Sequence, residues 1–118
     1  MEEYKFQKLE VYRQALEYVD CVYGLSEQLP QRERFNLCSQ IERAATSIVL
    51  NIAEGSTGQS NPEQRKFLGY AFRSYLETIA CLDLIQQRSY LPAGELSPLR
   101  EQGHRLFIKI IALSKSLR

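Results

Sequence analysis

Apolar residues recur at steps of three and four along almost the whole chain, which is the period of one face of an α-helix. The pattern divides into four amphipathic segments, and we predict helices over about residues 9–28, 33–54, 62–89 and 98–117. No segment carries the alternation that indicates a β-strand. Four helices of about 20 residues joined by short links are typical of an antiparallel up-down-up-down four-helix bundle. The sequence therefore predicts an all-α fold with a single domain, residues 1–118.

The first segment carries two adjacent apolar rows, both at helical spacing. One row is Leu9, Tyr12, Leu16, Val19 and Tyr23, and the other is Ala15, Tyr18, Val22, Leu25 and Leu29. The third and fourth segments have broader apolar faces than a minimal monomeric bundle requires. Seven tyrosines and five phenylalanines offer anchors for an interface. Self-association and simple filling of the core both explain these faces.

Pro30 and Gly55 mark the ends of the first two segments. Pro30 disfavours helical geometry at Leu29, so we expect the chain to turn there. Glycine is common in the left-handed position that follows many helices, and we predict that Gly55 adopts this conformation at the end of the second helix.

The next two helices each begin with a cap followed by a proline. Asn61 is the predicted N-cap of the third helix, with Pro62 at the first helical position and Gln64 three residues after the cap. Ser97 and Pro98 repeat this signal for the fourth helix.

Five polar residues of the second helix fall within one arc of about 80°, at about 100° per residue. They are Gln40, Arg43, Ser47, Asn51 and Glu54. We call them the polar stripe. The apolar positions predicted to face the core are centred well away from it: Leu37, Ile41, Ala44, Ala45, Ile48 and Ile52. Two interpretations stay open: a solvated face, and a buried or interfacial polar network.

Glu54 lies in the last turn of this helix, where the helix dipole disfavours a negative charge. An offsetting cation is therefore expected nearby. Arg43 is about 16 Å away along the helix axis, too far for direct contact. A partner for Glu54 would have to come from another helix or another subunit, and Glu77 of the third helix is a further carboxylate that could join the network.

Residues with catalytic or metal-binding chemistry occur without the necessary spacing. Cys21, Cys38 and Cys81 are odd in number and contain no Cys-x-x-Cys pair, so we interpret them as small buried residues. The only histidine, His104, lies in a segment predicted as helical and exposed, and no nucleophile accompanies the carboxylates. We predict no enzyme activity, no catalytic residues, no metal and no cofactor.

The net charge of +1 conceals an uneven distribution along the chain. Residues 1–60 carry a balance of −3 and residues 61–118 a balance of +4. Basic residues of the fourth helix could contact phosphates of RNA, namely Arg100, Arg105, Lys109, Lys115 and Arg118. The last two also complement the helix dipole, which explains them without a ligand. The small total differs from the strongly basic balance of dedicated nucleic-acid binders.

No apolar stretch approaches the roughly 20 residues that a membrane-spanning helix needs. The acidic start, Met1–Tyr4, is unlike the basic start of a signal peptide. We expect no membrane partner and a cytoplasmic location.

Several segments resemble the bacterial four-helix bundle protein family. They are Leu9–Tyr12, Leu37–Ala45, Ser47–Ile48, Phe67–Leu68, Leu76–Glu77 and, most specifically, the Asn-Ile-Ala-Glu-Gly segment Asn51–Gly55. This family includes the proteins encoded by intervening sequences within large-subunit ribosomal RNA genes. It is similar to the accessory protein of diversity-generating retroelements.

The resemblance implies a four-helix bundle that assembles into a ring-like homopentamer without known enzymatic chemistry. It makes the polar stripe, together with Gly55 and Glu77, a set of family-signature or interface residues. The retroelement relatives suggest binding to RNA and to a reverse transcriptase. Two function classes therefore stay open: a structural or adaptor oligomer that binds another protein, and an RNA-associated protein.

The chain departs from the family pattern at three positions. Tyr12 stands where tryptophan is common, Glu42 replaces the first residue of an Arg-Arg pair, and Val49 replaces a frequent proline. The lost arginine weakens the expectation of nucleic-acid binding, and the missing proline should leave the second helix straighter.

Overall fold

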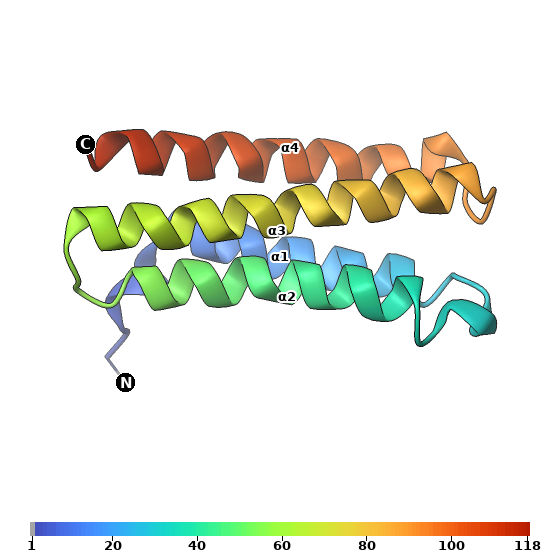
Figure 1. The fold of residues 1–118 in the computed structure, drawn as a ribbon, viewed down its shortest axis with the longest axis horizontal. Coiled ribbons are helices and arrows are strands. Elements are labelled where there is room, and N and C mark those ends of the chain that lie inside the picture. The colour runs from blue at the N-terminus through green and yellow to red at the C-terminus, as the bar shows by residue number, and fades with distance from the viewer. Residues whose placement is uncertain (1) are drawn as a thin grey trace.

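Four long helices and two short 3-10 turns make up the computed structural model, which describes residues 2–118 (Figure 1). In chain order they are η1 (Lys5–Lys8), α1 (Glu10–Ser26), η2 (Gln31–Glu33), α2 (Leu37–Gly55), α3 (Asn61–Gln87) and α4 (Ala93–Ser116). No strand occurs within the described residues. The predicted all-α class is confirmed.

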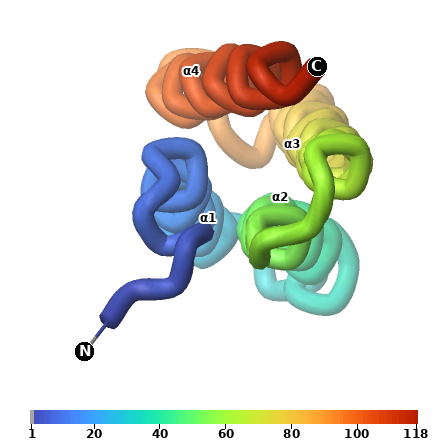
Figure 2. Tube along the Cα trace, turned by 90° about the vertical axis from the view of Figure 1, so that its left-hand side faces the viewer, coloured from blue at the N-terminus to red at the C-terminus, as the bar shows by residue number. Residues whose placement is uncertain are grey.

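The four helices lie side by side along the long axis of a molecule that measures 44 × 29 × 20 Å. Seen end-on in Figure 2, they occupy the corners of a square, in which α1 packs against α2 and α4, and α3 packs against the same two helices. The chain reverses direction at each link, so neighbouring helices are antiparallel (Figure 1). The predicted four-helix bundle is confirmed.

The core is filled by residues at helical spacing on all four helices. On α1 the buried row is the one that contains Ala15, Tyr18 and Val22, whereas Leu16 and Tyr23 of the other row are 43% and 42% exposed. Every aliphatic position predicted for α2 is buried: Leu37, Ile41, Ala44, Ala45, Ile48 and Ile52. The amphipathic pattern thus correctly locates the core. The structure shows that, of the two apolar rows of α1, the row with Ala15, Tyr18 and Val22 is the buried one.

A small cluster of hydrogen-bonded polar groups lies in the middle of this core. The hydroxyls of Tyr18 on α1 and Thr78 on α3 lie 2.7 Å apart, and Thr78 also donates a hydrogen bond to the carbonyl of Tyr75 at 2.6 Å. Both rings press against Gly103 of α4, where an added Cβ would lie 2.9 Å from Tyr75 and 3.0 Å from Tyr18. Burial raises the pKa of Tyr18 to about 12, because a phenolate would lose its hydration there.

Two helices begin at positions other than those predicted. Residues 31–33 form η2, and α2 starts only at Leu37, whose backbone N lies 3.5 Å from the carboxylate of Glu33. Helix α4 starts at Ala93, not at Pro98, because the carbonyl of Pro92 already accepts the first backbone hydrogen bonds. This earlier start buries Leu96 completely, and Pro98 is accommodated within the helix.

The start of α3 is displaced by one residue from the prediction. Its N-cap is Ser60, whose Oγ accepts a hydrogen bond from the backbone N of Glu63 at 3.4 Å. Asn61 is therefore inside the helix. Gln64 turns inward and donates to Ser56 Oγ at 3.0 Å, so it belongs to the helix junction and not to a capping pair.

Gly55 has a different role from the predicted one. It is the last residue of α2 and does not adopt the left-handed conformation, which Gly58 takes instead, with φ of 104°. An added Cβ at Gly55 would lie 2.5 Å from Cβ of Phe67, shorter than any ordinary contact. A glycine is needed because α2 and α3 approach each other closely at this point.

Candidate functional site

The polar stripe follows the groove between α2 and α3. In its middle, the side-chain amide of Asn51 donates to the carbonyl of Ser47 at 2.8 Å and to its Oγ at 3.0 Å. Ser74 of α3 donates to the same Oγ at 2.9 Å, which joins the two helices. Gln40 and Arg43 are exposed, and Arg43 donates only to Ser39 of its own helix. The stripe is thus a short, part-buried network with solvated ends.

Glu54 lies at one of these ends and is exposed. The ion pairs found within residues 2–118 join other side chains, so its carboxylate has no cationic partner there. Its backbone carbonyl accepts hydrogen bonds from Gln59 at 2.7 Å and Thr57 at 3.4 Å, which close the end of α2. Glu77 is exposed on α3, one turn beyond Ser74. The structure does not join these two carboxylates into one site.

The three cysteines differ in their surroundings. Cys81 is buried and Cys38 is half-buried, but Cys21 is exposed, which contradicts the prediction that all three are buried. Burial raises the pKa of the Cys81 thiol, the opposite of what a nucleophilic thiolate requires. His104 is exposed and packs beside Phe107. No group of three or more His, Cys, Asp or Glu residues suited to a metal occurs in the described part of the chain.

The basic residues of α4 do not form one surface. Arg100 donates to Asp83 of α3 at 2.9 Å, and Lys109 pairs with Glu10 of α1 at 3.4 Å. The helical period places Arg105 on the side of Lys109 and Lys115 on the side of Arg100, whereas Arg118 follows the end of α4. Of the five predicted phosphate ligands, Arg100 and Lys109 already neutralise carboxylates of the same chain.

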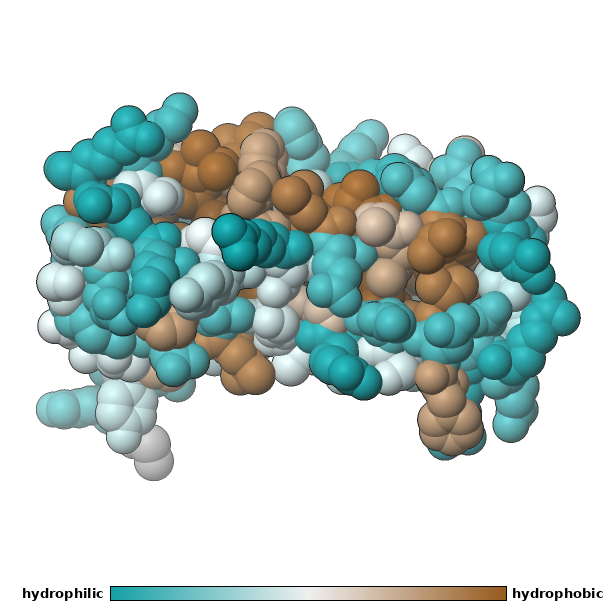
Figure 3. Space-filling model, viewed as in Figure 1, coloured by the Kyte–Doolittle hydropathy of each residue, from teal (hydrophilic) through white to brown (hydrophobic). Residues whose placement is uncertain are grey.

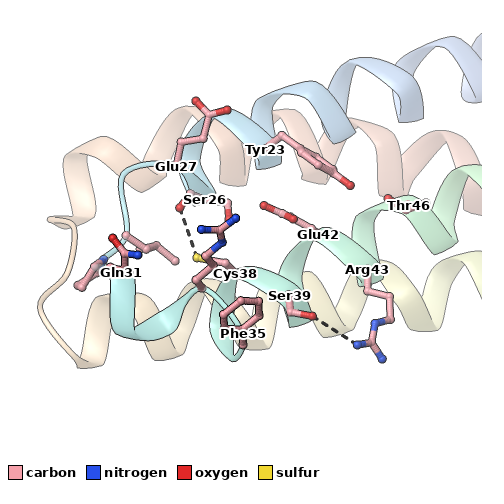
Figure 4. Close-up of a pocket in the computed structure, with 13 residues that line it drawn as sticks. Tyr23, Ser26, Glu27, Gln31, Phe35, Cys38, Ser39, Glu42, Arg43 and Thr46 are labelled. Atoms are coloured by element: carbon pink, nitrogen blue, oxygen red, sulfur yellow. Dashed lines mark hydrogen bonds between the residues drawn. The ribbon is translucent and has the colours of Figure 1, made fainter.

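A groove of about 820 Å³ opens where the end of α1 meets the start of α2 (Figure 4). Tyr23 and Glu42 both point into it (Figure 4). Cys38 also lines the groove, and its thiol donates to the carbonyl of Ser26 at 3.5 Å. Phe35 projects from its edge and is 88% exposed. Two arginines and two glutamates alternate along the lining, so the groove has no single charge sign to hold an anion or a cation: Glu27, Arg34, Glu42 and Arg43.

A polar cluster ties the α1–α2 link to the α3–α4 link at the same end of the bundle. Tyr90 donates to the buried Glu33 carboxylate at 2.6 Å, and Asn36 donates to its other oxygen at 2.9 Å. Arg32 reaches the Tyr90 hydroxyl, and the guanidinium of Arg88 lies 5.9 Å from the centre of that ring. These hydrogen bonds hold the pKa of Glu33 below its usual value. No periodic signal predicts this cluster, because its residues lie in the links.

Replacement Glu33→Gln is expected to lower the melting temperature at pH 7, because an amide accepts the Tyr90 and Asn36 hydrogen bonds less strongly than a carboxylate. Since the folded-state pKa of Glu33 is lowered, its contribution is present above the pKa of the unfolded chain and is lost as the pH falls through the folded value. Melting curves of both proteins between pH 7 and pH 3 should therefore converge toward acid. A difference in melting temperature between the two proteins that stays constant with pH would show that the Glu33 carboxylate does not stabilise the fold in this way.

An apolar surface covers the groove between α3 and α4, and we call it the α3–α4 face. It consists of Phe72, Leu76, Ile79, Phe107, Ile108 and Ile111. The rings of Phe72 and Phe107 lie 5.3 Å apart across the groove, while Leu76 and Ile108 at its outer edge are 46% and 51% exposed. Figure 3 shows brown apolar atoms gathered along these two helices. This is the broad apolar surface predicted for the third and fourth helices.

The fold defines an antiparallel four-helix bundle protein, and no group of residues suited to hold a metal occurs among its described residues. A family model described as the 23S rRNA-intervening sequence protein matches residues 7–113. The chain therefore belongs to the 23S rRNA-intervening sequence protein family.

The fold is similar to that of a solved protein of unknown function from the S23 ribosomal protein family of Bacteroides thetaiotaomicron VPI-5482. The TM-score is 0.81 at 24% sequence identity, over 89% of this chain and 98% of that chain, which shows the shared fold alone. A search of curated proteins found no match. Within residues 2–118, no helix is both long enough and apolar enough to cross a bilayer.

Proposed function

We propose that this protein is a non-enzymatic subunit of a homo-oligomer, which acts in the cytoplasm as a structural or adaptor protein for another protein. The observation that carries the proposal is the α3–α4 face, whose inner residues pack partly on the core and whose outer residues Leu76 and Ile108 are exposed. Contiguous exposed apolar surface is typical of sites where proteins associate.

The chemistry of this face suits a stable contact between proteins. Phe72 and Phe107 supply aromatic anchors at its centre, and Leu76 and Ile108 would be buried by a partner. Each fully buried aliphatic side chain of this size contributes about 1.5–3 kcal/mol relative to exposure. A ring of five subunits is the assembly suggested by the family resemblance.

Association with RNA is the second candidate function. It is supported by the family description, which refers to 23S rRNA, and by the exposed Arg105 and Lys115 of α4 and the exposed Arg118 that follows this helix. The pairing of Arg100 and Lys109 with carboxylates removes part of the positive charge that phosphates would need. Retention of RNA that weakens steeply with salt, with excess absorbance at 260 nm on the protein peak, would favour this function over the adaptor.

The double substitution Leu76→Glu with Ile108→Glu is expected to convert the oligomer to monomers of 13.7 kDa. Two carboxylates at the edge of the α3–α4 face would have to lose their hydration in the contact, and this unfavourable free energy exceeds the favourable free energy of burying the apolar side chains. Native mass, measured by light scattering on a size-exclusion column, checks this. A wild-type protein that is monomeric at high micromolar concentration would overturn the proposed function.

Leu84→Glu is the matched control for this experiment. Leu84 is also an exposed leucine of α3, but it lies on the side toward α2 and outside the α3–α4 face. The native mass of this variant should equal that of the wild type.

A further inference from the structure

Two arginines from distant parts of the chain approach one aromatic ring at the end of the bundle where the α1–α2 and α3–α4 links lie (Figure 1). Cζ of Arg32, in η2, is 5.6 Å from the centre of the Tyr90 ring, and Cζ of Arg88, directly after α3, is 5.9 Å from it. Arg32 also donates to the Tyr90 hydroxyl at 3.3 Å. Two guanidinium groups are therefore held beside the same side chain.

The backbone between Arg88 and Tyr90 makes a tight turn. Ser89 has a φ of 59°, which is unusual for a residue other than glycine, and the backbone N of Tyr90 donates to the carbonyl of Ile85 at 3.1 Å. This turn closes the end of α3 and brings Tyr90 back beside Arg88. The position of the ring between the two links is thus fixed by backbone hydrogen bonds as well as by side chains.

The two guanidinium groups carry positive charge that no ion pair neutralises. The ion pairs found within residues 2–118 join other side chains. The carboxylate of this cluster, Glu33, is buried and accepts hydrogen bonds from the neutral donors Tyr90 and Asn36. Arg32 and Arg88 are both exposed. The cluster therefore presents two guanidinium groups to solvent, while its one negative charge lies in the interior.

We propose that Arg32 and Arg88 form a binding site for a terminal phosphate group. A guanidinium group donates parallel N–H pairs to phosphate oxygens. A terminal phosphate carries a charge of about −1.5 to −2 and three acceptor oxygens, so it can accept hydrogen bonds from two guanidinium groups at once. Tyr90 is a positioning residue, because its ring attracts both cations and its hydroxyl orients Arg32. This inference goes beyond the proposed function and does not depend on self-association.

Titration calorimetry with inorganic phosphate tests the site. The wild type should bind one phosphate per chain and reach saturation. Arg32→Gln with Arg88→Gln should raise the dissociation constant by roughly tenfold or more, because the glutamines cannot donate charge-assisted hydrogen bonds. Circular dichroism should show wild-type helicity for this variant, since both replaced side chains are exposed.

Arg34→Gln with Arg73→Gln is the matched control. It removes the same charge from two other exposed arginines, one beside the Phe35 ring and one in the middle of α3. Its dissociation constant for phosphate should equal that of the wild type. An equal loss of affinity in the two double variants would show that phosphate responds only to net charge, and would overturn the site.

Two short single-stranded RNAs of one sequence, with and without a 5′-phosphate, distinguish the sources of the phosphate group. Tighter binding of the phosphorylated strand, lost in Arg32→Gln with Arg88→Gln, would assign the site to the end of a strand. If the 5′-phosphate adds no affinity while inorganic phosphate binds, the source is a small phosphorylated molecule. A wild type that binds no inorganic phosphate and does not distinguish the two RNAs would overturn the proposal. The native mass decides the proposed function separately.

Discussion

Gly55→Ala is expected to lower the free energy of unfolding by about 1–2 kcal/mol, although alanine favours helices over glycine. The added Cβ would lie 2.5 Å from Cβ of Phe67, an atom fixed to the backbone of α3 that no rotamer change can move. Helix α3 must therefore shift away from α2. Overpacking of this kind costs about 1–3 kcal/mol, and the gain in helix propensity offsets up to about 1 kcal/mol of it.

Gly69→Ala is the matched control for this substitution. Gly69 lies within α3 with no atom within 4 Å of an added Cβ. The same chemical change should there raise the free energy of unfolding by about 0.5–1 kcal/mol. Urea unfolding of the three proteins at one concentration, which keeps any assembly constant, measures the difference. A Gly55→Ala protein as stable as Gly69→Ala would show that the helices do not approach so closely.

The second large effect is expected at alkaline pH and comes from Tyr18. Burial raises the pKa of Tyr18 from 10.0 to about 12. Because the folded-state pKa is raised, the contribution of neutral Tyr18 is fully present below pH 10 and is lost as the pH rises toward 12. The loss is about 2–3 kcal/mol, because each tenfold change in the proton affinity of a group corresponds to about 1.4 kcal/mol.

Tyr18→Phe isolates this contribution from the other groups that titrate at high pH. At pH 8 the variant should be less stable than the wild type by about 0.5–1.5 kcal/mol, because Thr78 loses one hydrogen-bond partner. Near pH 12 the order should reverse, since phenylalanine has no proton to lose. Urea unfolding at a series of pH values measures both limits, and a stability difference that does not vary with pH would show that Tyr18 is not buried.

The arrangement of grooves bears on how the bundle is used. A hydrogen bond crosses the α2–α3 groove, and ion pairs cross the α1–α4 and α3–α4 grooves. The α3–α4 groove also presents the exposed side chains of Leu76 and Ile108. The polar stripe, which is the most specific sequence feature, is hydrogen-bonded within the chain at Ser47 and Asn51 and is solvated at its two ends. The apolar surface that we propose for a partner is the α3–α4 face.

Local sequence patterns were sufficient to predict the fold. The apolar period of three to four residues gives each helix one buried side, and this holds for Leu37, Ile41 and Ile48 of α2 as predicted. Helix ends were predicted less well, since the caps at Ser60 and Pro92 were each assigned further along the chain. A cap depends on which backbone groups the neighbouring elements leave unpaired, and a cap-and-proline pattern does not contain that information.

The sequence by itself determined an all-α bundle, its aliphatic core, the polar stripe and the opposite charges of the two halves. Only the tertiary structure decided which row of α1 is buried, why residue 55 must be glycine, and that Glu33 binds Tyr90. The first group follows from spacing along one helix. The second depends on contacts between residues far apart in the chain, which exist only once the four helices have packed.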